Sequence, residues 1–95
     1  MQFISISRRL TERFSNEEFA AHIDAERERV RELYRDRIVR AIWSRADTPG
    51  AVMLLECEDE AAARQAVGSL PLAQRAMLDV QILALDPYPA FFPQR

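Results

Sequence analysis

Hydrophobic and polar positions alternate at the start of the chain and then change to a helical period. Ile4 and Ile6 are separated by serines, which predicts a half-buried strand over residues 2–8. Ser15 and Glu18 then have the spacing of a capping box at the start of a helix. We predict one long helix over residues 16–36, because its apolar side chains fall on one face: Phe19, Ile23, Val30, Leu33 and Tyr34.

The remaining pattern predicts a hairpin, a shorter helix and a last strand. The elements follow as strand, turn, apolar central strand, helix, apolar link and strand, at residues 38–46, 47–50, 51–57, 58–67, 70–72 and 77–85. Gly68 is expected to end the second helix. Residues 86–93 carry three aromatic side chains among prolines and are not expected to form regular structure.

The order of these elements predicts an α+β fold of the ferredoxin-like βαββαβ type, with a four-stranded antiparallel sheet. We expect one domain over residues 1–95, in which residues 86–95 form a tail rich in proline and aromatic residues. Two helices cover one face of such a sheet, while the strands carry apolar residues toward the other face as well. An uncovered apolar face calls for a partner, so we expect a homodimer or a higher homo-oligomer, with two sheets face to face.

Charge on the long helix has the distribution of a solvated outer face. Three acid-first pairs lie three residues apart: Asp24–Arg27, Glu28–Arg31 and Glu32–Arg35. The net charge of the chain is −2, and the helix arginines are matched by acids, which argues against nucleic acid or an anionic membrane as the partner. No apolar run approaches the roughly 20 residues that span a bilayer, and a cytoplasmic location is the default expectation.

The composition also narrows the chemistry. All 13 basic residues are arginine, which excludes a Schiff-base lysine or a P-loop lysine. The chain has one cysteine, Cys57, and one histidine, His22, which argues against a metal site built from one chain. We therefore expect neither a metal nor another cofactor.

Glu26 is the leading candidate for a functional side chain. With Phe19 at 0° and about 100° per residue, Glu26 falls near −20°, within the apolar stripe. A carboxylate there could face a semi-apolar pocket and act as a general base, or it could pair with Arg45 or Arg40. His22, one turn earlier at the border of the stripe, could shuttle a proton with Glu26 or be structural.

Four further residues are candidates for binding a small organic molecule. Trp43 could stack on a planar ligand or pack in the core. Arg45 and Arg40 could orient a substrate carboxylate through bidentate hydrogen bonds, or they could be surface residues. Tyr34 belongs to the apolar stripe and is assigned to the pocket, the core or an interface.

Several short segments, in their order along the chain, resemble the muconolactone isomerase-like family of the dimeric α/β-barrel superfamily. They are the glutamate of residues 25–27, the tryptophan of residues 42–43, the link Gly68-Ser69-Leu70-Pro71-Leu72 and the end Leu85-Asp86-Pro87-Tyr88-Pro89. The resemblance implies a pocket between sheet and helices, and proton transfer on an unsaturated lactone without a cofactor. Residues 73–77 depart from the family, which has an aromatic segment there, and so do Val39 and Ala41, beside the tryptophan.

Three hypotheses about function follow. The first is a cofactor-free isomerase or cyclase, in which Glu26 abstracts a proton next to a carbonyl and an arginine or histidine steadies the enolate, on a lactone or polyketide-like compound. The second is a cofactor-independent monooxygenase. The third is a non-catalytic small-molecule-binding dimer, which the departure after Leu72 favours. This last hypothesis predicts that Glu26 is salt-bridged and adjoins no cavity.

Overall fold

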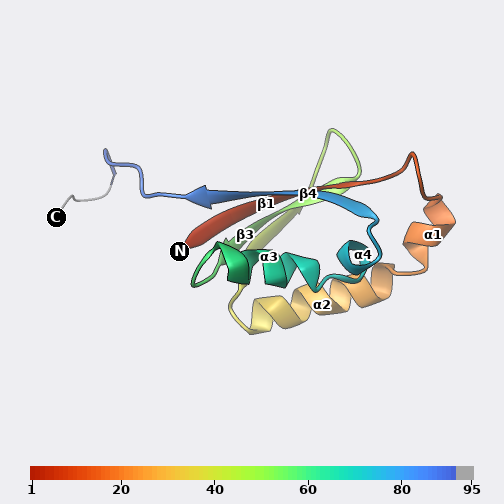
Figure 1. Ribbon diagram of the computed structural model, residues 1–95, viewed down its shortest axis with the longest axis horizontal. Helices are drawn as coiled ribbons and strands as arrows, with labels where there is room; N and C mark the ends of the chain where they lie inside the picture. Colours follow the sequence, from red (N-terminus) through yellow and green to blue (C-terminus); the bar gives the residue numbers. More distant parts are fainter. Residues whose placement is uncertain (92–95) are drawn as a thin grey trace.

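The computed structural model describes residues 1–91, and these form one antiparallel sheet with helices on one of its faces (Figure 1). The strands lie in the order β2-β3-β1-β4. The elements are β1 (Gln2–Arg9), α1 (Asn16–Ala20), α2 (Ile23–Arg35), β2 (Val39–Ser44), β3 (Gly50–Glu56), α3 (Glu60–Gly68), α4 (Pro71–Gln74) and β4 (Leu78–Leu85). The predicted α+β class and βαββαβ order are confirmed; the first predicted helix is divided into α1 and α2, and α4 is a short addition.

The main core lies between the sheet and helices α2 and α3. Phe3 and Leu55 are opposite each other on β1 and β3, and both are fully buried. Leu33 of α2 and Val67 of α3 pack against them. Alanines on α3 let this helix approach the sheet closely, because their side chains are short. Large side chains thus fill the space under the C-terminal half of α2.

The predicted long helix is wrong in one respect, because the chain breaks it at Ala21 and His22. The capping box is confirmed: Ser15 Oγ accepts from the Glu18 N–H, and Glu18 accepts from the Ser15 N–H. Phe19 of α1 then packs in a second cluster with Leu72 and Met77, away from the main core. One straight helix could not place side chains in both clusters, and α2 begins as a separate helix after His22.

Gly68 is the last residue of α3, so the expectation that it ends the second helix is confirmed; it has no positive φ, and Ser69 is the C-cap in a right-handed conformation. Two smaller expectations about the helices need correction. The expected apolar link at residues 70–72 is the start of α4, with Pro71 in its first turn. Tyr34 is 64% exposed and does not belong to the core of the chain.

A β-bulge in β2 decides which of its side chains face the helices. The register between β2 and β3 shifts between Val39 and Ala41, so Arg40 has no partner. Val39 and Ile42 therefore both lie on the helix side, opposite Leu55 and Met53 of β3. Trp43 points to the uncovered face of the sheet and is 54% exposed, so the alternative that it packs in the core is wrong.

The uncovered face of the sheet is apolar along its middle. The registers place apolar side chains of all four strands together there: Ile4, Ile6, Val52, Leu54, Trp43 and Leu83. Residues 86–91 continue from β4 without helix or strand, as predicted, and extend away from the sheet (Figure 1); the end of the tail, residues 92–95, lies outside the described residues. Across residues 1–91, no helix has the length and apolar character needed to cross a membrane.

Candidate active site

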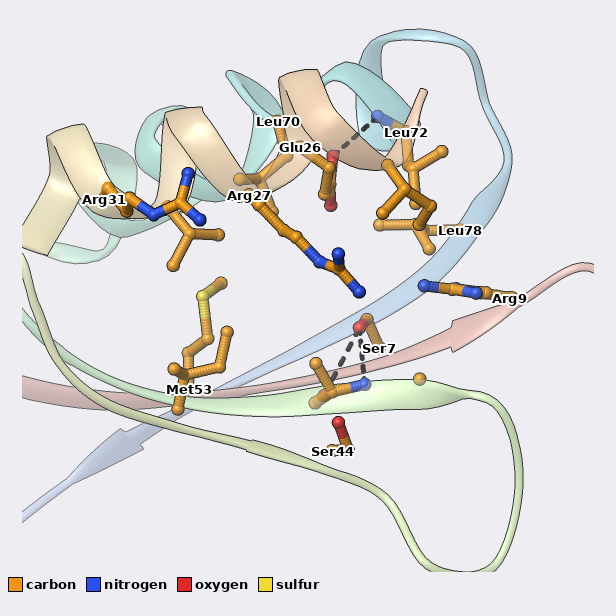
Figure 2. Close-up of a pocket in the computed structure, with 15 residues that line it drawn as sticks. Ser7, Arg9, Glu26, Arg27, Arg31, Ser44, Met53, Leu70, Leu72 and Leu78 are labelled. Carbon is orange, nitrogen blue, oxygen red and sulfur yellow. Dashed lines mark hydrogen bonds between the residues drawn. The ribbon is translucent and has the colours of Figure 1, made fainter. Parts of the chain in front are cut away.

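A cavity of about 360 Å³ lies between the N-terminal half of α2 and the sheet. It exists because the side chains beneath this part of the helix are short, at Ser7, Ser44, Gly50 and Ala51, where the core elsewhere has Phe3 and Leu55. Figure 2 shows the lining side chains between the helix and the strands. The remaining walls are seven apolar and four charged side chains: Ile23, Val30, Ile42, Met53, Leu70, Leu72, Leu78, Arg9, Glu26, Arg27 and Arg31. This size and mixture suit a small organic molecule.

Glu26 points from α2 into this cavity (Figure 2). Its Oε1 accepts a hydrogen bond of 3.0 Å from the backbone N–H of Leu72, at the start of α4. Burial raises the pKa of the Glu26 carboxyl above its usual value, while the Leu72 N–H and the Arg9 guanidinium act in the opposite direction. A half-buried carboxylate with a raised pKa is suited to accept a proton from carbon.

The alternatives that left Glu26 without a chemical role are not supported by its surroundings. Arg45 pairs with Asp47 at 2.7 Å, and Arg40 donates to the Arg37 carbonyl, so neither reaches Glu26. The non-catalytic hypothesis predicted a salt-bridged Glu26 with no adjoining cavity. Both parts of that expectation are wrong for the described residues, 1–91, where Glu26 has no ion pair and lines the cavity.

Two arginines supply positive charge to the same space, and the sequence patterns did not select them. Arg27 reaches from α2 toward Ser7, and Arg9 lies at the end of β1 (Figure 2). Within residues 1–91 neither has a carboxylate partner, and Arg9 rests over the Phe19 ring at 5.5 Å. Arg31 also lines the cavity but bonds to Glu28 at 3.3 Å. The cavity thus combines one carboxylate with two guanidiniums that are free to bind an anion.

The interpretation of Arg27 as half of a surface ion pair with Asp24 is wrong. The α2 ion pairs that form are Arg29–Glu32, Arg31–Glu28 and Arg35–Glu28. Arg27 follows Ile23 by four residues, so at about 100° per residue it lies about 40° from Ile23 around the helix, at the edge of the apolar stripe. That position was the available signal that its side chain could turn inward.

The other predicted site residues do not line this cavity in the chain. His22 precedes α2, and its carbonyl accepts the Glu26 N–H at 2.9 Å. Tyr34 and Arg40 line a separate polar groove at the corner between α2 and β2. Arg45 is held by Asp47 near the hairpin turn, and Trp43 is on the opposite face of the sheet. Roles for these five residues in catalysis or binding stay predictions.

The remaining chemical groups of residues 1–91 show no second reactive cluster. No three or more His, Cys, Asp or Glu side chains within this range gather closely enough to hold a metal ion. Cys57 is half-buried beside the main core, and burial raises the pKa of its thiol.

Comparisons with known proteins agree with the fold described above. A family model described as muconolactone delta-isomerase matches residues 1–90. A crystal structure of muconolactone isomerase superposes with a TM-score of 0.79 at 18% sequence identity, covering 100% of this chain and 98% of the other. A search of curated proteins finds no match.

Proposed function

This chain belongs to the muconolactone delta-isomerase family, and we propose that it is a cofactor-free isomerase that moves a proton next to a carbonyl of a small unsaturated molecule. Family membership suggests a small-molecule isomerase, and the residues that line the cavity support a specific proton transfer. The single observation that carries the proposal is the position of Glu26, a carboxylate of raised pKa inside a cavity with free arginines.

The proposed reaction is a proton shift with two steps. The Glu26 carboxylate takes a proton from the carbon next to the carbonyl, and the C–H electron pair moves toward the carbonyl oxygen to form an enolate. A guanidinium stabilises that oxygen by charge-assisted hydrogen bonds. The Glu26 carboxylic acid then returns the proton to a different carbon of the conjugated system, so the double bond migrates and the enzyme is regenerated.

Charge in the cavity favours a substrate that is itself an anion. Glu26 contributes one negative charge, whereas Arg9 and Arg27 contribute two positive charges without an ion pair in residues 1–91. One guanidinium can face the enolate oxygen while the other binds a carboxylate bidentately. The proposed substrate class is therefore a small unsaturated lactone, or a similar carbonyl compound, that carries a carboxylate.

Deuterium exchange tests the proposed reaction. Muconolactone and a set of unsaturated lactones with and without a carboxylate are incubated with the protein in D₂O and followed by NMR. We expect deuterium incorporation next to the carbonyl, together with migration of the double bond, in the carboxylated compounds. Binding without any exchange across the set would favour the non-catalytic alternative, and uptake of oxygen with phenolic compounds would favour the monooxygenase.

Arg27→Ala should lower kcat/KM by about tenfold, the expected loss when a charge-assisted hydrogen bond to substrate is removed. Arg27→Lys should recover part of the activity, because it keeps the charge without the bidentate geometry. Arg35→Ala is the matched control, since Arg35 is on the same helix and pairs with Glu28 outside the cavity. Equal activity of the Arg27→Ala and Arg35→Ala variants would show that Arg27 does not contact substrate.

Pairing through the uncovered sheet face is the second part of the proposal. Trp43 and Leu83 are 54% and 42% exposed in the single chain, in the middle of an apolar surface. Leu83→Asp should shift the sedimentation coefficient of the protein from that of a dimer to that of a monomer. Tyr34→Ser removes an exposed aromatic ring from a different surface and should leave the assembly unchanged. A wild-type protein that sediments as a monomer at all concentrations would overturn the pairing.

A further inference from the structure

The segment between α3 and α4 is attached to α2 at two points, and one of them is Glu26. Glu26 accepts the Leu72 N–H, as described above. One helical turn along α2, Arg29 donates from Nε to the Ser69 hydroxyl at 2.9 Å. Residues 69 and 72 are therefore held by side chains that are themselves three residues apart on one helix.

The contact between Arg29 and Ser69 has the features of a fixed hydrogen bond. The Ser69 hydroxyl donates its own hydrogen to the Ala66 carbonyl at 2.6 Å, so its lone pairs are free to accept from Arg29. Arg29 is also held by Glu32 at 3.2 Å, and its side chain is only 33% exposed. The contact joins α2 to the end of α3, between residues that are 40 positions apart in the sequence.

The segment that this contact anchors forms one wall of the cavity. Leu70 and Leu72 both line it, and Pro71 between them restricts the backbone. A displacement at Ser69 would consequently be transmitted to Leu72 over three residues with little flexibility. The Leu72 N–H would then move relative to the Glu26 carboxylate.

We infer that Arg29, acting through Ser69, is a positioning residue that sets the Leu70–Leu72 wall and the hydrogen bond from Leu72 to Glu26. This inference rests on the proposed role of Glu26 as the base. The charged groups that face Glu26 are Arg9 from β1 and Arg27 and Arg31 from α2, whereas β2, β3 and the Leu70–Leu72 wall present uncharged groups to the cavity. Substitution of Ser69 or Arg29 leaves all of these in place.

The test measures titration of the Glu26 carboxyl carbon by ¹³C NMR, without substrate, in the wild type, Ser69→Ala, Ser69→Thr and Arg29→Ala. Loss of the anchor should weaken the Leu72 N–H bond to the carboxylate and so raise the pKa of Glu26 in Ser69→Ala and Arg29→Ala. Ser69→Thr retains the hydroxyl and should titrate like the wild type. Arg64→Ala removes an α3 arginine that pairs with Glu60 outside the cavity, and should have no effect.

Activity provides the second measurement. In Ser69→Ala and Arg29→Ala, kcat/KM should fall about three- to tenfold, and its acid limb should move to higher pH. A merely structural role would lower the melting temperature and leave both the Glu26 titration and the pH limb in place, which would overturn the inference. Ser69→Ala removes one oxygen atom only, so it decides the question if Arg29→Ala fails to fold. A wild type without isomerase activity would overturn the proposed function, whereas the titration would still decide the positioning role.

Discussion

Glu26→Gln should lower the rate of deuterium exchange next to the substrate carbonyl by about 10²–10⁴-fold, the usual contribution of a general base. Glutamine has nearly the same size and can still accept the Leu72 N–H through its amide oxygen, so the wall of the cavity should stay in place. The substitution removes only the ability to take a proton. Substrate affinity should consequently change much less than the rate.

The comparison that isolates this effect is Glu60→Gln, which removes an exposed carboxylate from α3. Glu60 pairs with Arg64, and neither residue lines the cavity. The two variants are compared by exchange NMR and by inhibitor or product binding under the same conditions. Exchange that proceeds in Glu26→Gln at the wild-type rate would assign the proton transfer to another group and overturn the proposed mechanism.

The same substitution should affect stability in a pH-dependent way. Burial raises the Glu26 pKa in the folded chain, so the folded state binds more protons than the unfolded state between the two pKa values. The stability that the carboxyl contributes is fully present at a pH below the pKa of Glu26 in the unfolded state. It declines as the pH rises through the pKa of Glu26 in the folded state. Glu26→Gln has no such loss, and its stability relative to the wild type should therefore increase with pH across that window in urea unfolding.

The position of Glu26 could be predicted from the sequence because a helix places residues on its faces by a fixed angle. A carboxylate within a stripe of apolar residues must reach a partner or a cavity, whatever the tertiary fold. Ser15 and Glu18 were predictable for the same reason, since a capping box depends on residues only three positions apart. Local geometry was sufficient in both cases.

Arg27 and Trp43 show what local patterns could not supply. Arg27 was paired with Asp24 by spacing alone, but the short side chains of Ser7 and Ala51 on distant strands leave the space into which it turns. Trp43 was expected to stack on a ligand or to pack in the core, but the bulge at Arg40 places it on the face of the sheet opposite to Val39. Both outcomes depend on contacts between elements, which residue periodicity does not encode.

Gly50→Ala should be among the most destabilising single substitutions in the chain, at a cost of about 3 kcal/mol in the free energy of unfolding. Gly50 begins β3 opposite Arg8 of β1, and a methyl group on it would collide with the Ser7 carbonyl. The obstacle is backbone of the neighbouring strand, which cannot rotate away, and the added methyl group would also lie 3.1 Å from the Arg45 side chain. The strands must separate at the end that forms the cavity floor.

Gly68→Ala is the matched control, because it adds the same methyl group where nothing lies within 4 Å. Gly68 ends α3 without a positive φ, so alanine should stabilise the chain by about 0.5 kcal/mol through lower backbone entropy in the unfolded state. Urea unfolding of both variants measures the contrast. Gly50→Ala should also raise KM, since Ser7 and Ala51 carry the floor of the cavity and their mutual hydrogen bonds lie beside the collision. Equal stability of the two variants would mean that β1 and β3 do not approach closely at Gly50, and that the floor of the cavity is not held by this contact.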